Sequence, residues 1–174
     1  MRRNNFSDDD SIGIRQKSFD IAVIMNFLFL NIIYAGAAFF VRNIIFTQIV
    51  NSPTRKLGNE IIALYRHNDA GVLWNMFQSN HDALEAMSFL AVAVVAFIVI
   101  MNSAKMHQSL ISALAFFTSG IILHIIDRTM YGYVIDYIKL GIFPSLPMFN
   151  IADIMIIAGI LGVINSAMSR KWAQ

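Results

Sequence analysis

Four long apolar runs, separated by polar stretches, dominate the pattern of the chain. A helix that crosses the hydrocarbon core of a bilayer needs roughly 20 predominantly apolar residues. Each run is therefore predicted to form a transmembrane helix, and the first is too long for a cleaved signal peptide and is expected to be permanent. The four runs lie at about 21–41, 84–101, 110–126 and 151–168.

Two polar segments accompany these runs. Residues 1–20 hold no apolar run and are expected to form an aqueous tail. Residues 42–82 are polar and rich in turn formers, and within them 60–65 and 72–77 are short stretches rich in aliphatic and aromatic residues. Because these stretches flank a turn-like sequence at 67–71, they predict a small β element on the membrane surface.

The composition of the 174 residues fits a membrane protein, since 57% are hydrophobic and only 14% are charged. Soluble domains average about 45–50% apolar and about 25% charged residues. We therefore expect a single domain over 1–174, an all-α membrane protein with four transmembrane helices and a small β element and loop on the extracytoplasmic face. The chain has no cysteine, which excludes disulfides and thiolate chemistry, and its net charge of +2 is too small to indicate nucleic-acid binding.

The basic residues give the expected orientation. Seven lie on the side of the termini and six on the other side, which weakly favours cytoplasmic termini under the positive-inside rule. The segments 42–82 and 127–150 then share the extracytoplasmic face. The seven are Arg2, Arg3, Arg15, Lys17, Lys105, Arg170 and Lys171.

Three acids, Asp127, Asp136 and Asp153, lie between the end of the third span and the start of the fourth. A carboxylate at mid-bilayer costs about 2.5–3.5 kcal/mol on insertion scales, so such acids need a partner or a function. Asp136 precedes Asp153 by 17 residues in a section that returns to the same membrane edge, and the two carboxyls can meet. A close carboxyl pair shares one proton and so provides a general base and a general acid, which hydrolyse amides without metal or cofactor.

The same acids also have purely structural interpretations. Asn150 and Asp153 have the spacing of a helix capping box. Asp127 and Arg128 are adjacent and would form an interfacial ion pair, beside an aromatic belt of tyrosines. None of the four histidines has a second ligand at metal spacing, so we expect no metal site. Spacing alone does not choose between catalytic and structural roles.

Two blocks in the last third of the chain resemble the signatures of the lipoprotein signal peptidases, or signal peptidase II, a family of four-span bacterial aspartyl proteases. The first block reads His124-Ile125-Ile126-Asp127-Arg128 and then Gly132-Tyr133-Val134-Ile135-Asp136. The second reads Phe143-Pro144 and then Phe149-Asn150-Ile151-Ala152-Asp153. The resemblance covers the last third closely and most of the remaining chain loosely.

The resemblance implies a membrane aspartic endopeptidase that removes the signal peptide of prolipoproteins, cleaving before the diacylglyceryl-modified Cys. It assigns the catalytic dyad to Asp136 and Asp153, with no cofactor, and makes the segment 42–82 a β-cradle with a substrate-guiding loop. It implies a place in the bacterial inner membrane, contact with membrane lipid and binding of cyclic peptide inhibitors of the globomycin type. One dyad in one chain needs no partner, so we expect a monomer. Supporting, substrate-binding positions would be Asp127, Arg128, Asn150 and Ala152.

The sequence departs from the family pattern at three further positions. His124 stands where the family has Asn, and a lone His in an apolar span is otherwise expected to hydrogen-bond a neighbouring helix. An Asn-x-Gly block of the family aligns with Asp69 and Gly71, which puts Asp in place of Asn unless an insertion lets Asn68 serve. The Asp-x-x-x-Lys motif of the first span falls on 34–38, where neither residue is present.

These departures indicate a divergent member of the family and bear on substrate preference, pH optimum and inhibitor binding. The alternative from the same resemblance is an inactive or repurposed relative that binds lipoprotein signal sequences or lipids. A second alternative is a four-span scaffold whose acids serve only as caps and ion pairs.

Overall fold

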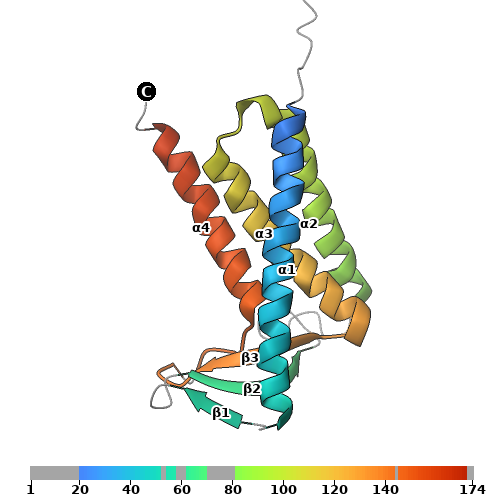
Figure 1. The fold of residues 1–174 in the computed structure, drawn as a ribbon, viewed down its shortest axis with the longest axis vertical. Coiled ribbons are helices and arrows are strands. Elements are labelled where there is room, and N and C mark those ends of the chain that lie inside the picture. The colour runs from blue at the N-terminus through green and yellow to red at the C-terminus, as the bar shows by residue number, and fades with distance from the viewer. Residues whose placement is uncertain (1–19, 52–53, 58–61, 70–80, 144, 172–174) are drawn as a thin grey trace, which may run out of the picture.

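The computed structural model describes residues 20–51, 54–57, 62–69, 81–143 and 145–171. Four long helices lie side by side, and a small sheet crosses one end of the bundle (Figure 1). The start of the first helix and the end of the last lie together at the opposite end. The helices are α1 (Ile21–Asn51), α2 (His81–Asn102), α3 (Gln108–Tyr131) and α4 (Ile151–Lys171), with a short 3-10 turn η1 (Ser103–Lys105) before α3. The strands are β1 (Thr54–Leu57), β2 (Ile62–Asp69) and β3 (Val134–Leu140).

All four helices are long and apolar enough to cross a membrane. Large apolar side chains stand exposed along α1, α2 and α4, as expected where lipid replaces water around the bundle. The predicted fold class, four membrane helices with a small β element, is confirmed.

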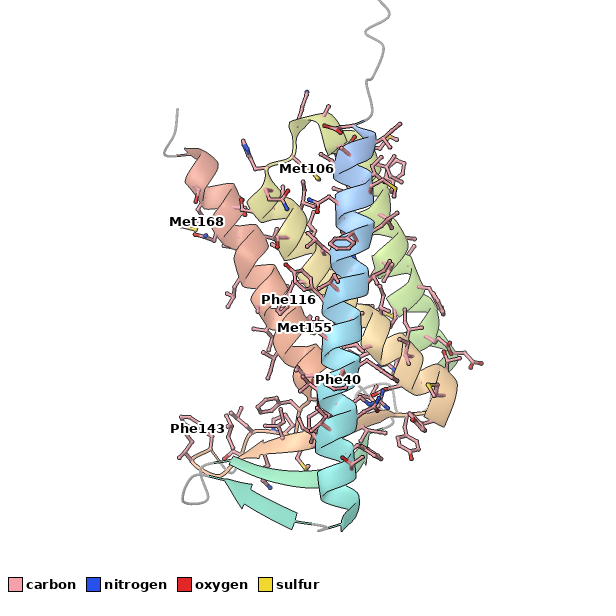
Figure 2. The ribbon with its side chains drawn as sticks, viewed as in Figure 1. Phe40, Met106, Phe116, Phe143, Met155 and Met168 are labelled. Carbon is pink, nitrogen blue, oxygen red and sulfur yellow. The ribbon has the colours of Figure 1, made fainter. Side chains whose placement is uncertain are left out.

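α3 is the central helix of the bundle. Of its span, 56% is buried, against 11–17% for the other three spans. Its contact with α4 is very close: a Cβ atom added to Gly120 would lie 2.6 Å from the carbonyl oxygen of Ala152, and one added to Gly159 would lie 2.6 Å from the backbone nitrogen of Phe117. Phe116 and Met155 lie in the same contact (Figure 2). Glycine is required at these two points because the backbones leave no room for a side chain.

A buried polar cluster joins α1 to α3 in the middle of the bundle. Asn31 Oδ1 accepts hydrogen bonds from Thr118 Oγ1 at 2.6 Å and from Ser119 Oγ at 3.2 Å. Asn31 Nδ2 donates to the carbonyl of Phe27 at 2.9 Å. Polar side chains inside a membrane need such partners, and these bonds explain how an Asn is accommodated in the first span.

The sheet is antiparallel with the order β1-β2-β3. β2 contains residues 62–65 of the first predicted stretch, but it continues through 67–69, where the sequence predicted a turn, because these residues pair with β3 and stay extended. β2 also pairs with β1, and the second predicted stretch, 72–77, lies outside the described residues. β3 was not predicted. Its residues 134–137 are all buried, so they lack the alternation that marks a half-buried strand. Gly132, at φ 78°, ends α3 in the left-handed conformation and lets the chain turn into β3.

α1 extends ten residues beyond the predicted end of the first span at Val41. The polar residue expected to end the span, Arg42, is buried with 5% exposure, and apolar residues continue at 44–46. The charge of Arg42 did not end the helix because a carboxylate on α3 neutralises it, as described below.

Candidate active site

Asp136 lies on β3, at the end of the helix bundle. Its side chain is buried, with 6% exposure for the residue. Oδ1 accepts a hydrogen bond of 2.7 Å from Asn150 Nδ2. A strand that emerges from the end of α3 thus places this carboxyl against the first residues before α4.

Asp153 lies in the first turn of α4, and Asn150 caps that helix. Asn150 Oδ1 accepts from the backbone N–H groups of Ala152 at 2.8 Å and Asp153 at 3.2 Å, and Asp153 Oδ2 accepts from the backbone N–H of Asn150 at 2.8 Å. This reciprocal pattern is a capping box, so that structural interpretation is confirmed. The same Asn150 donates its amide to Asp136, and it therefore contacts both candidate catalytic carboxyls.

The residues before α4 are also held by β3. Ile138 and Phe149 exchange two backbone hydrogen bonds, at 2.8 and 3.0 Å, and the backbone N–H of Ile151 donates to Tyr137 Oη at 3.1 Å. Burial raises the pKa of Tyr137 to about 12, so its phenol stays protonated at physiological pH. These bonds fix the start of α4 relative to the strand that carries Asp136.

His124 reaches the same site from α3. Its Nε2 lies 3.0 Å from Asp153 Oδ1, and its side chain is 12% exposed. Nδ1 is buried and makes no hydrogen bond with any residue that the structure describes. The expectation that His124 contacts a neighbouring helix is confirmed.

Asp127 pairs with Arg42 of α1, a partner that the sequence did not indicate. Arg42 Nη1 lies 2.7 Å from Asp127 Oδ1, and both side chains are nearly inaccessible. The distance is that of an ion pair, although neither atom meets hydrogen-bond geometry, so charge attraction is the main force between them. The guanidinium also lies 5.3 Å from the ring centres of Phe39 and Tyr131.

The predicted pairing of Asp127 with its neighbour Arg128 needs correction. Arg128 turns to α2, where Nη1 donates to Ser88 Oγ at 3.2 Å. Adjacent residues on a helix point in different directions, and this separates the two side chains. The sequence did hold one signal that Arg42 needs a buried partner: it is a single cation between the apolar residues 39–41 and 44–46.

The other predicted site residues are placed as follows. Ala152 is buried in the contact of α4 with α1 and α3. Asn68 and Asp69 lie at the end of β2, where their backbones pair with Ile135 and Val134, next to Asp136. Gly71 lies outside the described residues. Within the described part of the chain, no three His, Asp or Glu side chains are grouped to hold a metal ion.

Comparisons with known proteins give the family of the chain. The sequence model of the family described as "Signal peptidase (SPase) II" matches residues 30–168, which is most of the chain. The chain belongs to the signal peptidase II family. With its four apolar helices, it is a multi-pass bacterial membrane protein.

Individual relatives and a solved structure resemble the chain as well. A lipoprotein signal peptidase of Mesorhizobium japonicum is 35% identical over 102 residues, which cover 56% of this chain and 59% of the relative. One of Dehalococcoides mccartyi is 34% identical over 101 residues, covering 56% and 61%. The matched regions thus span about three fifths of these relatives. A bacterial membrane enzyme solved by the in meso method at 2.3 Å has the same fold, with a TM-score of 0.71, 16% identity and coverage of 89% of this chain and 93% of that one.

Proposed function

We propose that the protein is a membrane aspartic endopeptidase that removes the signal peptide from lipid-modified prolipoproteins, cleaving before the diacylglyceryl-Cys. One observation carries the proposal. Asn150 is hydrogen-bonded to Asp136 through its side chain and to Asp153 through its backbone, in a chain of the signal peptidase II family. This arrangement supports a water-activating carboxyl pair, as aspartic proteases use.

In the proposed reaction, the ionised carboxyl of the pair takes a proton from water, and the water oxygen attacks the scissile carbonyl. The protonated carboxyl donates its proton to the carbonyl oxygen. When the tetrahedral intermediate collapses, the proton taken from water passes to the leaving amine and the hydroxyl proton returns to the acid, so the pair again shares one proton. Asn150 orients the two acids. We assign substrate contact to Asn68 and Asp69, because β2 runs beside the strand of Asp136, and to Arg128, as the family resemblance implies.

We further propose that the sheet lies on the extracytoplasmic side of the inner membrane and that both termini are cytoplasmic. The site lies at the sheet end of the bundle, where the lipid chains of the substrate can enter sideways between helices while the peptide reaches the acids. The turn after β3 exposes Ile142, Phe143 and Leu146, which suits contact with the membrane surface. Phe143 lies at one end of the sheet, to the side of the helix bundle (Figure 2).

Cleavage of a defined precursor tests the function. Purified protein in lipid or detergent is incubated with a diacylglyceryl-modified prolipoprotein, and the masses of the products are measured by mass spectrometry. We expect a mature product that begins with the modified Cys, and no product from a precursor whose Cys is replaced by Ser. Tight binding of the modified precursor without any cleavage would instead support a non-catalytic relative.

Asn150→Ser separates the cap from the link between the acids. A Ser oxygen still caps α4, so the cap itself should change stability by no more than about 0.5 kcal/mol, and loss of the buried hydrogen bond to Asp136 should cost about 1–3 kcal/mol. The donor to Asp136 is lost, and kcat is expected to fall by about 10- to 100-fold because the carboxyl is no longer held in place. Thermal unfolding and steady-state cleavage measure the two effects. A variant that unfolds like the parent and cleaves at the parental rate would show that the amide does not orient the dyad.

A further inference from the structure

The two carboxyls of the site have different surroundings. Asp153 accepts from the backbone N–H of Asn150 at 2.8 Å and lies 3.0 Å from His124 Nε2, and its side chain is 33% exposed. Asp136 is 6% exposed, and its Oδ1 accepts from the Asn150 amide. Exposure and hydrogen-bond donors favour a charged carboxylate, whereas burial favours a protonated one.

The nitrogens of His124 indicate its proton state. Beside an ionised Asp153, Nε2 must carry a proton, because a carboxylate only accepts hydrogen bonds. Nδ1 is buried without a partner among the described residues, and a proton there would leave an unpaired N–H group. The ring is therefore best satisfied as the neutral tautomer with its proton on Nε2.

Resting on the proposed function, we propose that His124 is a positioning residue that gives the two acids of the dyad different roles. His124 donates a hydrogen bond from Nε2 to Asp153 and keeps Asp153 as the ionised acid that activates water. Asp136 is then the acid that carries the proton. The family pattern has Asn at this position, so the pairing of an imidazole with the dyad distinguishes this chain. In each cycle Asp153 takes a proton from water while Asp136 protonates the carbonyl oxygen. When the tetrahedral intermediate collapses, Asp153 passes its proton to the leaving amine and Asp136 recovers a proton from the hydroxyl group, so both acids return to their starting states.

Other charged groups near the imidazole are few within the described residues. Asp153 approaches from α4, and Asp136 joins it through Asn150 from β3. On α3 itself, Asp127 acts on His124 by charge, and Arg42 of α1 pairs with that acid. Because Arg42 already balances Asp127, the donor from His124 is free to serve Asp153.

The variants His124→Phe and His124→Gln test the proposal. His124→Phe keeps a ring but has no donor, so kcat should fall by about 10- to 100-fold with KM unchanged. His124→Gln supplies an amide donor in place of Nε2 and should recover most of the activity. His107→Asn, at an exposed His at the far end of α3, is the matched control and should change neither kcat nor KM.

A second readout does not depend on activity. In ¹⁵N-histidine spectra of the full chain, the His124 signals, identified by their loss in His124→Gln, should show a protonated Nε2 and a bare Nδ1. The Nε2 signal should shift in Asp153→Asn. The proposal is overturned if Nε2 is bare, or if His124→Phe keeps the parental kcat. If these spectra are as expected but the parent does not cleave the lipidated precursor, the proposed function fails while the His124–Asp153 contact stands.

Discussion

Asp136→Asn and Asp153→Asn are each expected to lower cleavage of the lipidated precursor by about 10⁴-fold, the upper range for loss of general acid–base catalysis. Asparagine has nearly the same shape as aspartate but neither takes up nor gives a proton. An Asn at 136 can still accept from Asn150, and an Asn at 153 can still accept from the backbone N–H that caps α4. The fold should therefore persist, and rates with matched amounts of folded protein measure the chemistry alone.

The double variant gives a sharper result than either single one. Residues that act as one unit are strongly non-additive, so Asp136→Asn/Asp153→Asn should be no slower than the single variants. Asp82→Asn removes an exposed acid from the first turn of α2 and should cleave at the parental rate. Full activity in either single variant would exclude the pair as the catalytic dyad.

The sequence predicted the apolar helices well because the signal for a membrane span is simple and long. Length and hydropathy located α2 and α4 to within three residues at either end. The end of the first span was harder to predict. A hydropathy scale counts Arg42 as unfavourable in a membrane, and it does not show that an acid on α3 pairs with this charge. The small sheet was the hardest part to predict. Residues 134–137 of β3 are all buried, and a short buried run without alternation occurs in helices as well as in strands.

For the site, the sequence indicated the acids but not how they are held. Asn150 offered two interpretations, a helix cap or a supporting residue of the dyad, and the structure shows that one side chain caps the helix and also contacts Asp136. The contact between His124 and Asp153 spans 29 residues and two helices, so no local pattern contains it. Such contacts depend on how α3 and α4 pack, and Gly120 and Gly159 set that packing.

Arg42→Met is expected to destabilise the protein by about 3–5 kcal/mol, the usual cost of leaving one member of a buried ion pair without its partner. Arg42 and Asp127 are both almost fully buried, and the pair joins α1 to α3. The first-span Asp-x-x-x-Lys motif is missing, and Tyr34 at its first position instead bonds Ser112 at 2.8 Å. Arg42, further along α1, is then the described cation that ties this helix to an acid of α3. Unfolding in detergent by heat or denaturant measures the loss.

A double replacement distinguishes the ion pair from the bulk of the side chain. Arg42→Met/Asp127→Leu replaces both charges with apolar groups, and a buried pair exchanged in this way is often neutral in stability. We expect the double variant to be at least about 2 kcal/mol more stable than Arg42→Met, because it leaves no buried charge without its partner. Lys139→Met, at a partly exposed cation on β3, should cost less than about 1 kcal/mol. If the double variant were as unstable as the single one, packing of Arg42 against Phe39 and Tyr131, and not its charge, would be what holds α1 in place.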